Sequence, residues 1–268
     1  MRSIAVASGK GGVGKTLLSS NFGCFLAIEG HKVLVFDADL GLANLDIALG
    51  LNPTKSLKHV IRGGVPLKEI IVEGPAGIHV VPGGSGVSEL ANLNPQRLES
   101  LLSEIQDVAQ DYDYVIFDVA AGIDTMAVSF MAAADELALV CTPEPSAMID
   151  AYAAVKTLNS VRPTAEISVV VNMCDNLRHG KLVYERLHMI TGQFLQRDIK
   201  FAGAIRRDDN MIACTRQRQP IVLAHPASNG AKDIEDTVKM LFYGKEASTK
   251  GPGFAQRLLN ILLMRKSA

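Results

Sequence analysis

A glycine-rich run between an apolar segment and a helix-forming segment constrains this 268-residue chain more than any other feature. The run is Gly9-Lys10-Gly11-Gly12-Val13-Gly14-Lys15-Thr16, which fits the phosphate-loop pattern G-x-x-x-x-G-K-[ST]. Residues 4–7 before it resemble a buried strand, and a helical stretch begins at Leu17. Glycines let successive backbone N–H groups turn toward one centre, where an anion sits at a helix N-terminus. The run predicts a phosphate site on a strand–loop–helix unit; the alternative is a flexible surface loop.

Apolar runs typical of strands alternate with longer helical stretches along the rest of the chain. Several runs, such as Val33-Leu34-Val35-Phe36, are apolar throughout, as strands buried on both faces are. We therefore predict an α/β fold of the P-loop NTPase type, with a doubly wound, mostly parallel sheet flanked by helices. The predicted strands cover residues 3–8, 32–36, 78–81, 114–119, 137–141, 167–171 and 202–205, and the predicted helices cover residues 17–29, 95–110, 147–161, 181–195 and 231–242.

Composition and charge narrow the function classes. Lys and Arg (27) nearly balance Asp and Glu (28), so the net charge of −1 disfavours nucleic acid as a partner. No apolar run reaches the roughly 18–20 residues that span a bilayer, and no signal peptide precedes the first predicted strand. The four cysteines have no metal-ligand spacing. We expect a cytoplasmic protein with reduced thiols.

The C-terminal part divides at a Gly-, Pro- and Lys-containing stretch. Residues 1–243 are predicted to form the phosphate-loop domain, 244–253 a linker, and 254–268 a C-terminal amphipathic helix. On a helix at about 100° per residue, one broad apolar arc forms, which includes Phe254, Leu258, Leu259, Ile261 and Leu262. Such a face with cationic flanks suits peripheral binding to a membrane surface. It equally suits packing on the protein's own body, and neither alternative excludes the other.

Three aspartates follow predicted strands at the sheet edge where open α/β sheets bind ligands. They are Asp37, Asp39 and Asp118. An apolar strand that ends in Asp118 is the Walker B arrangement, which holds Mg²⁺ directly or through water. Lys15 can reach the β- and γ-phosphates, and the Thr16 hydroxyl can hold Mg²⁺. The alternative for each aspartate is a helix cap or a turn.

The second lysine of the loop carries a family resemblance. Residues 10–16 resemble the deviant phosphate loop of the MinD/ParA ATPases, whose extra lysine reaches the partner's phosphates in an ATP-bound homodimer. The resemblance implies an ATP- and Mg²⁺-dependent ATPase with Lys10 in this role, slow without a partner. It assigns Asp39 to orienting the attacking water, Asp37 to the outer shell of the magnesium, and residues 41–46 to a switch segment. Read alone, Lys10 is also compatible with a solvated charge.

Adenine recognition rests on the same resemblance. Asn172 follows a predicted strand at the position where relatives bind the adenine edge, and an amide can pair with a donor and an acceptor on a base. The segment containing Arg206 and Asp208 corresponds to the loop that flanks adenine, although relatives have proline where Arg206 stands. A turn-forming asparagine is the alternative for Asn172.

Longer phrases indicate a branch of the family. Residues 37–46, 77–83 and 143–152 resemble the FlhG/FleN (MinD-like) regulators of flagellar number, and Asp150 lies in the segment that forms their dimer or partner face. The resemblance implies a switch that controls flagellar number or placement. Its partners would be the GTPase FlhF, switch-complex components or a flagellar transcription activator, at the inner face of the cell membrane. The alternatives are a division-site MinD-type membrane ATPase and a ParA-like DNA-associated regulator, for which Arg206, Arg207, Arg216 and Arg218 offer a modest basic cluster.

Overall fold

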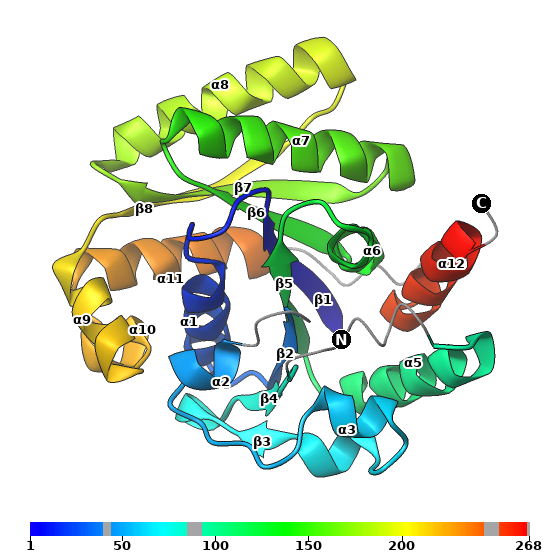
Figure 1. Cartoon of the computed structure of the whole chain (residues 1–268). Helices are drawn as coiled ribbons and strands as arrows, with labels where there is room; N and C mark the ends of the chain where they lie inside the picture. Colours follow the sequence, from blue (N-terminus) through cyan, green and yellow to red (C-terminus); the bar gives the residue numbers. More distant parts are fainter. Residues whose placement is uncertain (40–43, 85–92, 244–251, 267–268) are drawn as a thin grey trace.

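The computed structural model describes residues 1–39, 44–84, 93–243 and 252–266, and Figure 1 shows their arrangement. The strands are β1 (Arg2–Ser8), β2 (Val33–Ala38), β3 (Val72–Glu73), β4 (His79–Val81), β5 (Tyr114–Ala121), β6 (Glu136–Cys141), β7 (Glu166–Cys174) and β8 (Lys200–Arg206). The helices are α1 (Lys15–Ile28), α2 (Leu45–Ala48), α3 (Leu57–Ile61), α5 (Pro95–Ala109), α6 (Thr125–Ala133), α7 (Pro145–Val161), α8 (Leu177–Leu195), α9 (Asp209–Gln217), α10 (Ile221–Ala224), α11 (Asn229–Phe242) and α12 (Phe254–Lys266), with 3₁₀ turns η1 (Leu67–Ile70) and η2 (Pro75–Gly77).

One sheet of order β3-β4-β2-β5-β1-β6-β7-β8 runs through the molecule. Every pairing in it is parallel except that of β3 with β4. Helices cover both faces, with α1 and α11 on one and α6, α7 and α8 on the other (Figure 1). Alternate residues of β1 supply the two cores: Ile4 and Val6 join the first, Ala5 and Ala7 the second. The predicted doubly wound fold is confirmed.

Each predicted strand and helix is present, with small differences at its ends. Helix α6 escaped prediction because it is apolar nearly all round and therefore lacks the periodicity of an amphipathic helix. Helix α9 was also missed, although Asp208 caps it. Strand β3 has only two residues, too few to produce a pattern.

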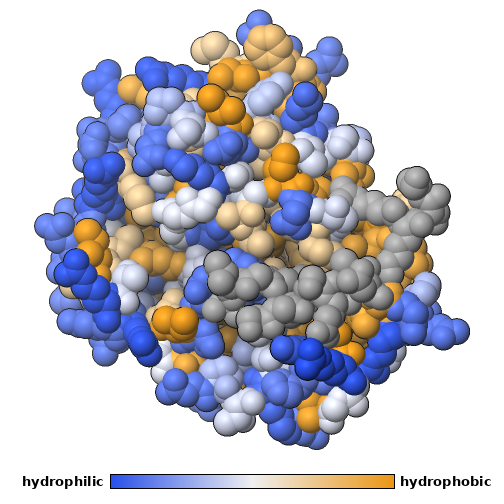
Figure 2. All heavy atoms as spheres, viewed as in Figure 1, coloured by the Kyte–Doolittle hydropathy of each residue, from blue (hydrophilic) through white to orange (hydrophobic). Residues whose placement is uncertain are grey.

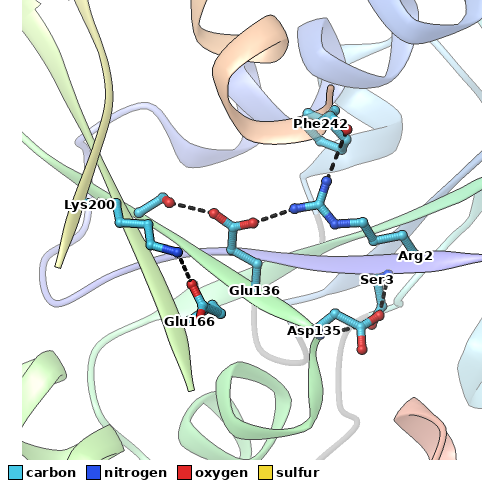
Figure 3. Close-up of polar contacts among 8 residues, drawn as sticks. Arg2, Ser3, Asp135, Glu136, Glu166, Lys200 and Phe242 are labelled. Carbon is cyan, nitrogen blue, oxygen red and sulfur yellow. Dashed lines mark hydrogen bonds and ion pairs between the residues drawn. The ribbon is translucent and has the colours of Figure 1, made fainter. Parts of the chain in front are cut away.

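A polar network ties the strand ends opposite the glycine-rich loop (Figure 3). The buried Arg2 guanidinium pairs with Glu136 and donates a bond of 3.1 Å to the carbonyl of Phe242, at the end of α11. Glu136 also accepts a bond from Ser168 on β7. Because the Arg2 and Glu136 charges are buried, this pairing is what makes their burial tolerable. It fixes β1, β6 and β7 against α11.

Helix α12 packs on the body between α5 and α6 (Figure 1). The Phe254 ring stacks on Phe117 with centroids 4.1 Å apart, and Leu258 is fully buried. Arg257 fixes the helix further, with an ion pair of 2.6 Å to Asp135. Of the predicted linker, residues 244–251 lie outside the described part of the chain.

Candidate nucleotide site

The glycine-rich run connects β1 to α1, as its position in the sequence predicts. Gly14 is the N-cap of α1 and has a φ of 92°, while Gly12 has a φ of 78°. Both angles lie in the left-handed region that side-chain-bearing residues avoid. The loop therefore ends at a helix N-terminus, whose free N–H groups favour an anion.

Two loop glycines are also required by close packing against other elements. A Cβ at Gly9 would lie 2.1 Å from the carbonyl oxygen of Asp150 on α7. A Cβ at Gly14 would lie 2.5 Å from the amide nitrogen of Asn172. The loop is thus held between α7 on one side and the end of β7 on the other.

Charged side chains meet at the carboxyl ends of the central strands. Asp37 on β2 and Asp118 on β5 are direct neighbours in the parallel register, with exposed fractions of 1% and 2%. Lys15 is 9% exposed; burial lowers the pKa of its ammonium, and the nearby charges of Asp118 and Asp39 oppose that shift without reversing it. The structure therefore brings together Lys15, Asp37, Asp39 and Asp118, as expected.

Burial dominates the protonation of these groups. It raises the pKa of Asp37 to about 8, helped by the charge of Asp118 beside it. It raises the pKa of Asp118 to about 6, although hydroxyls of Thr16 and Ser19 donate to that carboxylate, Ser19 at 3.0 Å. Burial also lowers the pKa of Lys15. Burial disfavours the ionised form of both carboxyl groups. A cation bound between them would stabilise that ionised, negatively charged form.

The oxygen donors suit magnesium. Mg²⁺ prefers hydroxyl, carboxylate, phosphate and water oxygens, and commonly takes only one or two protein ligands in nucleotide sites. Thr16 and Asp118 supply a hydroxyl and a carboxylate in contact, with Asp37 adjacent. Among the described residues no group of three His, Cys, Asp or Glu side chains forms a metal site. Ser19, one helical turn after Thr16, is a member that the sequence analysis missed.

Asp37 has a second, structural task. Its carboxylate accepts the backbone N–H of Asp39 at 3.1 Å and that of Leu45 at 3.3 Å. It thereby holds the backbone just before the predicted switch of residues 41–46 and again near the end of that switch. Residues 40–43, which include the start of the switch, lie outside the described residues. The role of Asp39 in orienting water stays a prediction.

The Lys10 side chain binds the start of α7. Its ammonium donates to Glu144 at 2.8 Å and to Ser146 at 3.0 Å, both at the start of α7. The Lys10 side chain is 37% exposed and that of Glu144 is 60% exposed. Hydrogen bonding to Lys10 lowers the pKa of Glu144. In this conformation Lys10 lies on the surface, and neither partner was foreseen from the sequence.

A pocket of about 460 Å³ adjoins the loop on the side away from Asp118. Its polar lining includes Asn172 and its apolar lining includes Leu17, Met211 and Ile212. The buried Asn172 amide donates to the carbonyl of Val13 at 2.8 Å, so it fastens β7 to the loop. The sequence analysis named Asn172 in this lining but missed the apolar Met211 and Ile212, which only their position after a predicted strand could have indicated.

Two predicted base contacts have partners inside the protein. The Arg206 guanidinium makes two bonds of 2.8 Å to Asp233 on α11. Asp208 accepts the backbone N–H groups of Asn210 at 2.9 Å and Gly230 at 2.8 Å, which caps α9 and joins it to α11. Both residues line the pocket. Their contact with adenine stays a prediction, and the structure shows a scaffolding role for each.

The predicted membrane-facing residues are mostly buried in this conformation. Phe254, Leu258, Leu259 and Leu262 are at most 8% exposed, and Ile261 is half-buried. Membrane contact through this face would require α12 to leave the body. No helix in the described part of the chain is long and apolar enough to cross a bilayer. Figure 2 shows hydrophobic side chains among hydrophilic ones near the middle of the viewed face, with a largely hydrophilic rim at the left.

Comparisons with known proteins agree with this geometry. A family model described as an AAA domain matches residues 1–171. The antiactivator FleN of Pseudomonas aeruginosa is 36% identical over 85% of this chain and 81% of its own length. The flagellum site-determining protein YlxH of Helicobacter pylori is 35% identical over 89% of this chain and 81% of its own length. The septum site-determining protein MinD of Pyrococcus horikoshii, solved with Mg-ADP, superposes with a TM-score of 0.74 at 25% identity, covering 90% of this chain and 96% of that one.

Proposed function

Because the chain belongs to the MinD/ParA family of P-loop ATPases, in the branch of the FlhG/FleN regulators, we propose that it is an ATP-driven dimerising switch that controls flagellar number or placement. ATP with Mg²⁺ is the proposed ligand, since the family is one of nucleotide-binding ATPases and a MinD relative holds Mg-ADP. FleN is named an antiactivator and YlxH a site-determining protein. The name antiactivator implies that FleN acts on an activator, and we propose that this chain likewise acts through a second protein that responds to its nucleotide state.

The position of Lys10 is the main observation that supports the proposed switch. Held by Glu144 and Ser146, it lies on the surface beside its own loop, where a second copy can approach. A cation supplied by another subunit would stabilise phosphate charge only in the dimer, so nucleotide state and association become linked. The charge developing on phosphate would then be incompletely stabilised in a monomer. We infer that hydrolysis is slow without a partner.

Exposed apolar residues beside the loop support self-association at this face. Ile149 on α7 is 69% exposed and is next to Asp150, whose carbonyl abuts Gly9. Ile123 is 47% exposed, and Gly122 before it bonds the carbonyl of Ser8. Isoleucines that gain little from packing in the monomer can be buried between two copies.

Light scattering tests the switch directly. Asp39→Ala protein with ATP and Mg²⁺ should double in mass, since dimerisation would proceed while hydrolysis is blocked. Adding Lys10→Ala should leave it monomeric with nucleotide still bound. Lys156→Ala, which removes an exposed lysine elsewhere on α7, is the matched control and should dimerise normally. A wild-type chain that binds ATP but never changes mass would contradict the proposal.

Deletion of the gene in its host tests the biological output. We expect extra or misplaced flagella with normal cell division. Minicells with normal flagellation would instead indicate a division-site role, and the nucleotide chemistry would remain unaffected by that result. Counting flagella and minicells in the same electron micrographs separates the two outcomes.

A further inference from the structure

The outer edge of β8 is open in the part of the chain that the structure describes. The strand is the last of the sheet and pairs only with β7. An edge strand presents backbone N–H and C=O groups to which another strand can bond. Figure 1 shows β8 at the end of the sheet between α8 and α11.

A groove of about 450 Å³ follows this edge. Four successive β8 residues form its floor: Phe201, Ala202, Gly203 and Ala204. Because successive strand residues point to opposite faces, a groove lined by four in a row runs along the strand itself. One wall comes from α8 and the other from α11, so a strand added at this edge would lie between the two helices.

The two walls differ in chemistry. The α8 wall carries Arg178 and Lys181, both exposed and without a side-chain hydrogen bond or ion pair among the described residues. On the α11 wall, Asp233 is paired with Arg206, Asp236 is an exposed carboxylate, and Thr237 and Met240 contribute small and apolar surface. The two positive charges on the α8 wall therefore exceed the one negative charge that Asp236 adds on the α11 wall.

We propose that this groove binds an extended peptide segment of a partner protein as a ninth strand. Side chains of such a strand alternate between the two walls, so acidic residues would face α8 and apolar residues would face α11. Arg178 and Lys181 are three residues apart on α8, a rise of about 4.5 Å along the helix. Alternate residues of a strand are about 6.8 Å apart. Long basic side chains can span the difference between this spacing and that of Arg178 and Lys181. The segment recognised has acidic residues at every second position and apolar residues between them.

An irregularity in β8 favours selectivity. The register with β7 skips Ala202, which is a bulge between Phe201 and Gly203. Bulges discourage indiscriminate pairing at sheet edges. A segment must therefore gain affinity from the walls of the groove as well as from backbone bonds. This surface is separate from the phosphate loop, so the inference does not depend on the proposed switch.

The test uses the full-length chain and a short fluorescein-labelled peptide in which Glu and Val alternate. Fluorescence anisotropy should detect binding, and hydrogen exchange should show slower exchange of β8 amides in the complex. The double variant Arg178→Glu/Lys181→Glu should weaken binding about tenfold, as the loss of two partly exposed ion pairs predicts. Arg186→Glu changes an exposed arginine on α8 outside the groove and should leave affinity unchanged.

Two further peptides separate strand addition from simple charge attraction. A peptide of the same composition with its Glu residues in one block should bind more weakly, and so should one N-methylated at alternate nitrogens. The proposal is overturned if the alternating peptide does not bind, if the double variant binds it as wild type does, or if binding leaves β8 exchange unchanged. ATPase rates of all variants should equal that of wild type, which shows that they fold and keeps this test independent of the nucleotide site.

Discussion

The phosphate side and the base side of the nucleotide site treat polar groups differently. Lys15, Asp37 and Asp118 are buried. Burial lowers the pKa of Lys15 and raises the pKa values of the two aspartates, so it favours the neutral form of each side chain. On the base side, Arg206 and Asp208 use their hydrogen bonds to join β8, α9 and α11. On the phosphate side, a ligand would stabilise the ionised forms of the buried side chains. On the base side, the charged side chains already have partners within the protein and surround an apolar pocket. Substitutions should therefore affect function on the first side and stability on the second.

The largest expected effect is on catalysis at Asp118. Asp118→Asn removes the charge of the proposed magnesium ligand, so Mg²⁺-dependent ATP hydrolysis should fall about 10²- to 10³-fold. Asp209→Asn neutralises an exposed carboxylate in the lining of the base pocket and is the matched control. It should keep nearly the full rate in a phosphate-release assay. Equal losses of hydrolysis rate in Asp118→Asn and Asp209→Asn would contradict the expected difference between the phosphate side and the base side.

Arg206 should matter for stability more than for nucleotide affinity. In Arg206→Met the Asp233 carboxylate, 2% exposed, loses its bidentate partner. The free energy of unfolding in urea should fall by about 2 kcal/mol, which is below the roughly 3–5 kcal/mol of a fully buried pair because Arg206 itself is partly exposed. Arg207→Met, on a neighbouring exposed arginine, should cost less. A large loss of ATP affinity without loss of stability would instead make Arg206 a base contact.

Asp37 should make the nucleotide-free protein less stable as the pH rises. Its folded-state pKa of about 8 is above the unfolded value, so its contribution to stability is full below about pH 4. That contribution is progressively lost up to about pH 8. Asp37→Asn removes this titration, and its thermal midpoint should exceed that of wild type by about 3 °C at pH 8.5.

The difference between Asp37→Asn and wild type should be smaller at pH 6, and Mg²⁺ with nucleotide should narrow it by stabilising the ionised carboxylate. Calorimetry of both proteins with and without Mg-ADP measures these differences. A gap that stays constant with pH would show that burial of the Asp37 charge is not its cause.

The smallest effect should come from the wall of the base pocket. Ile212 is 55% exposed in the lining of the pocket, so a base bound there would cover part of its side chain. Ile212→Ala should weaken ATP binding about threefold, through loss of roughly 0.7 kcal/mol of apolar contact. Leu223→Ala, a partly exposed residue on α10 outside the pocket, should have no effect on binding measured by fluorescence titration.

Features encoded by contiguous residues could be predicted. The phosphate loop needs one run of eight residues between a strand and a helix, so its geometry is specified locally. The strands before Asp37 and Asp118 were predicted from unbroken apolar runs, and parallel packing brings their ends to one edge. The sequence thus determined the fold class and the phosphate half of the site.

Only the tertiary structure decided the remaining contacts, because they join residues far apart in the chain. The residues beside Lys10 in the sequence do not indicate its contact with Glu144, and those beside Gly9 do not indicate its close approach to the carbonyl of Asp150. The amphipathic pattern of the C-terminal helix is compatible both with binding to a bilayer and with packing on the body of the protein. In this conformation the helix packs on the body, where Phe254 stacks on Phe117. An apolar pattern specifies that a face is to be buried, but the burial partner depends on which surfaces the complete fold brings together.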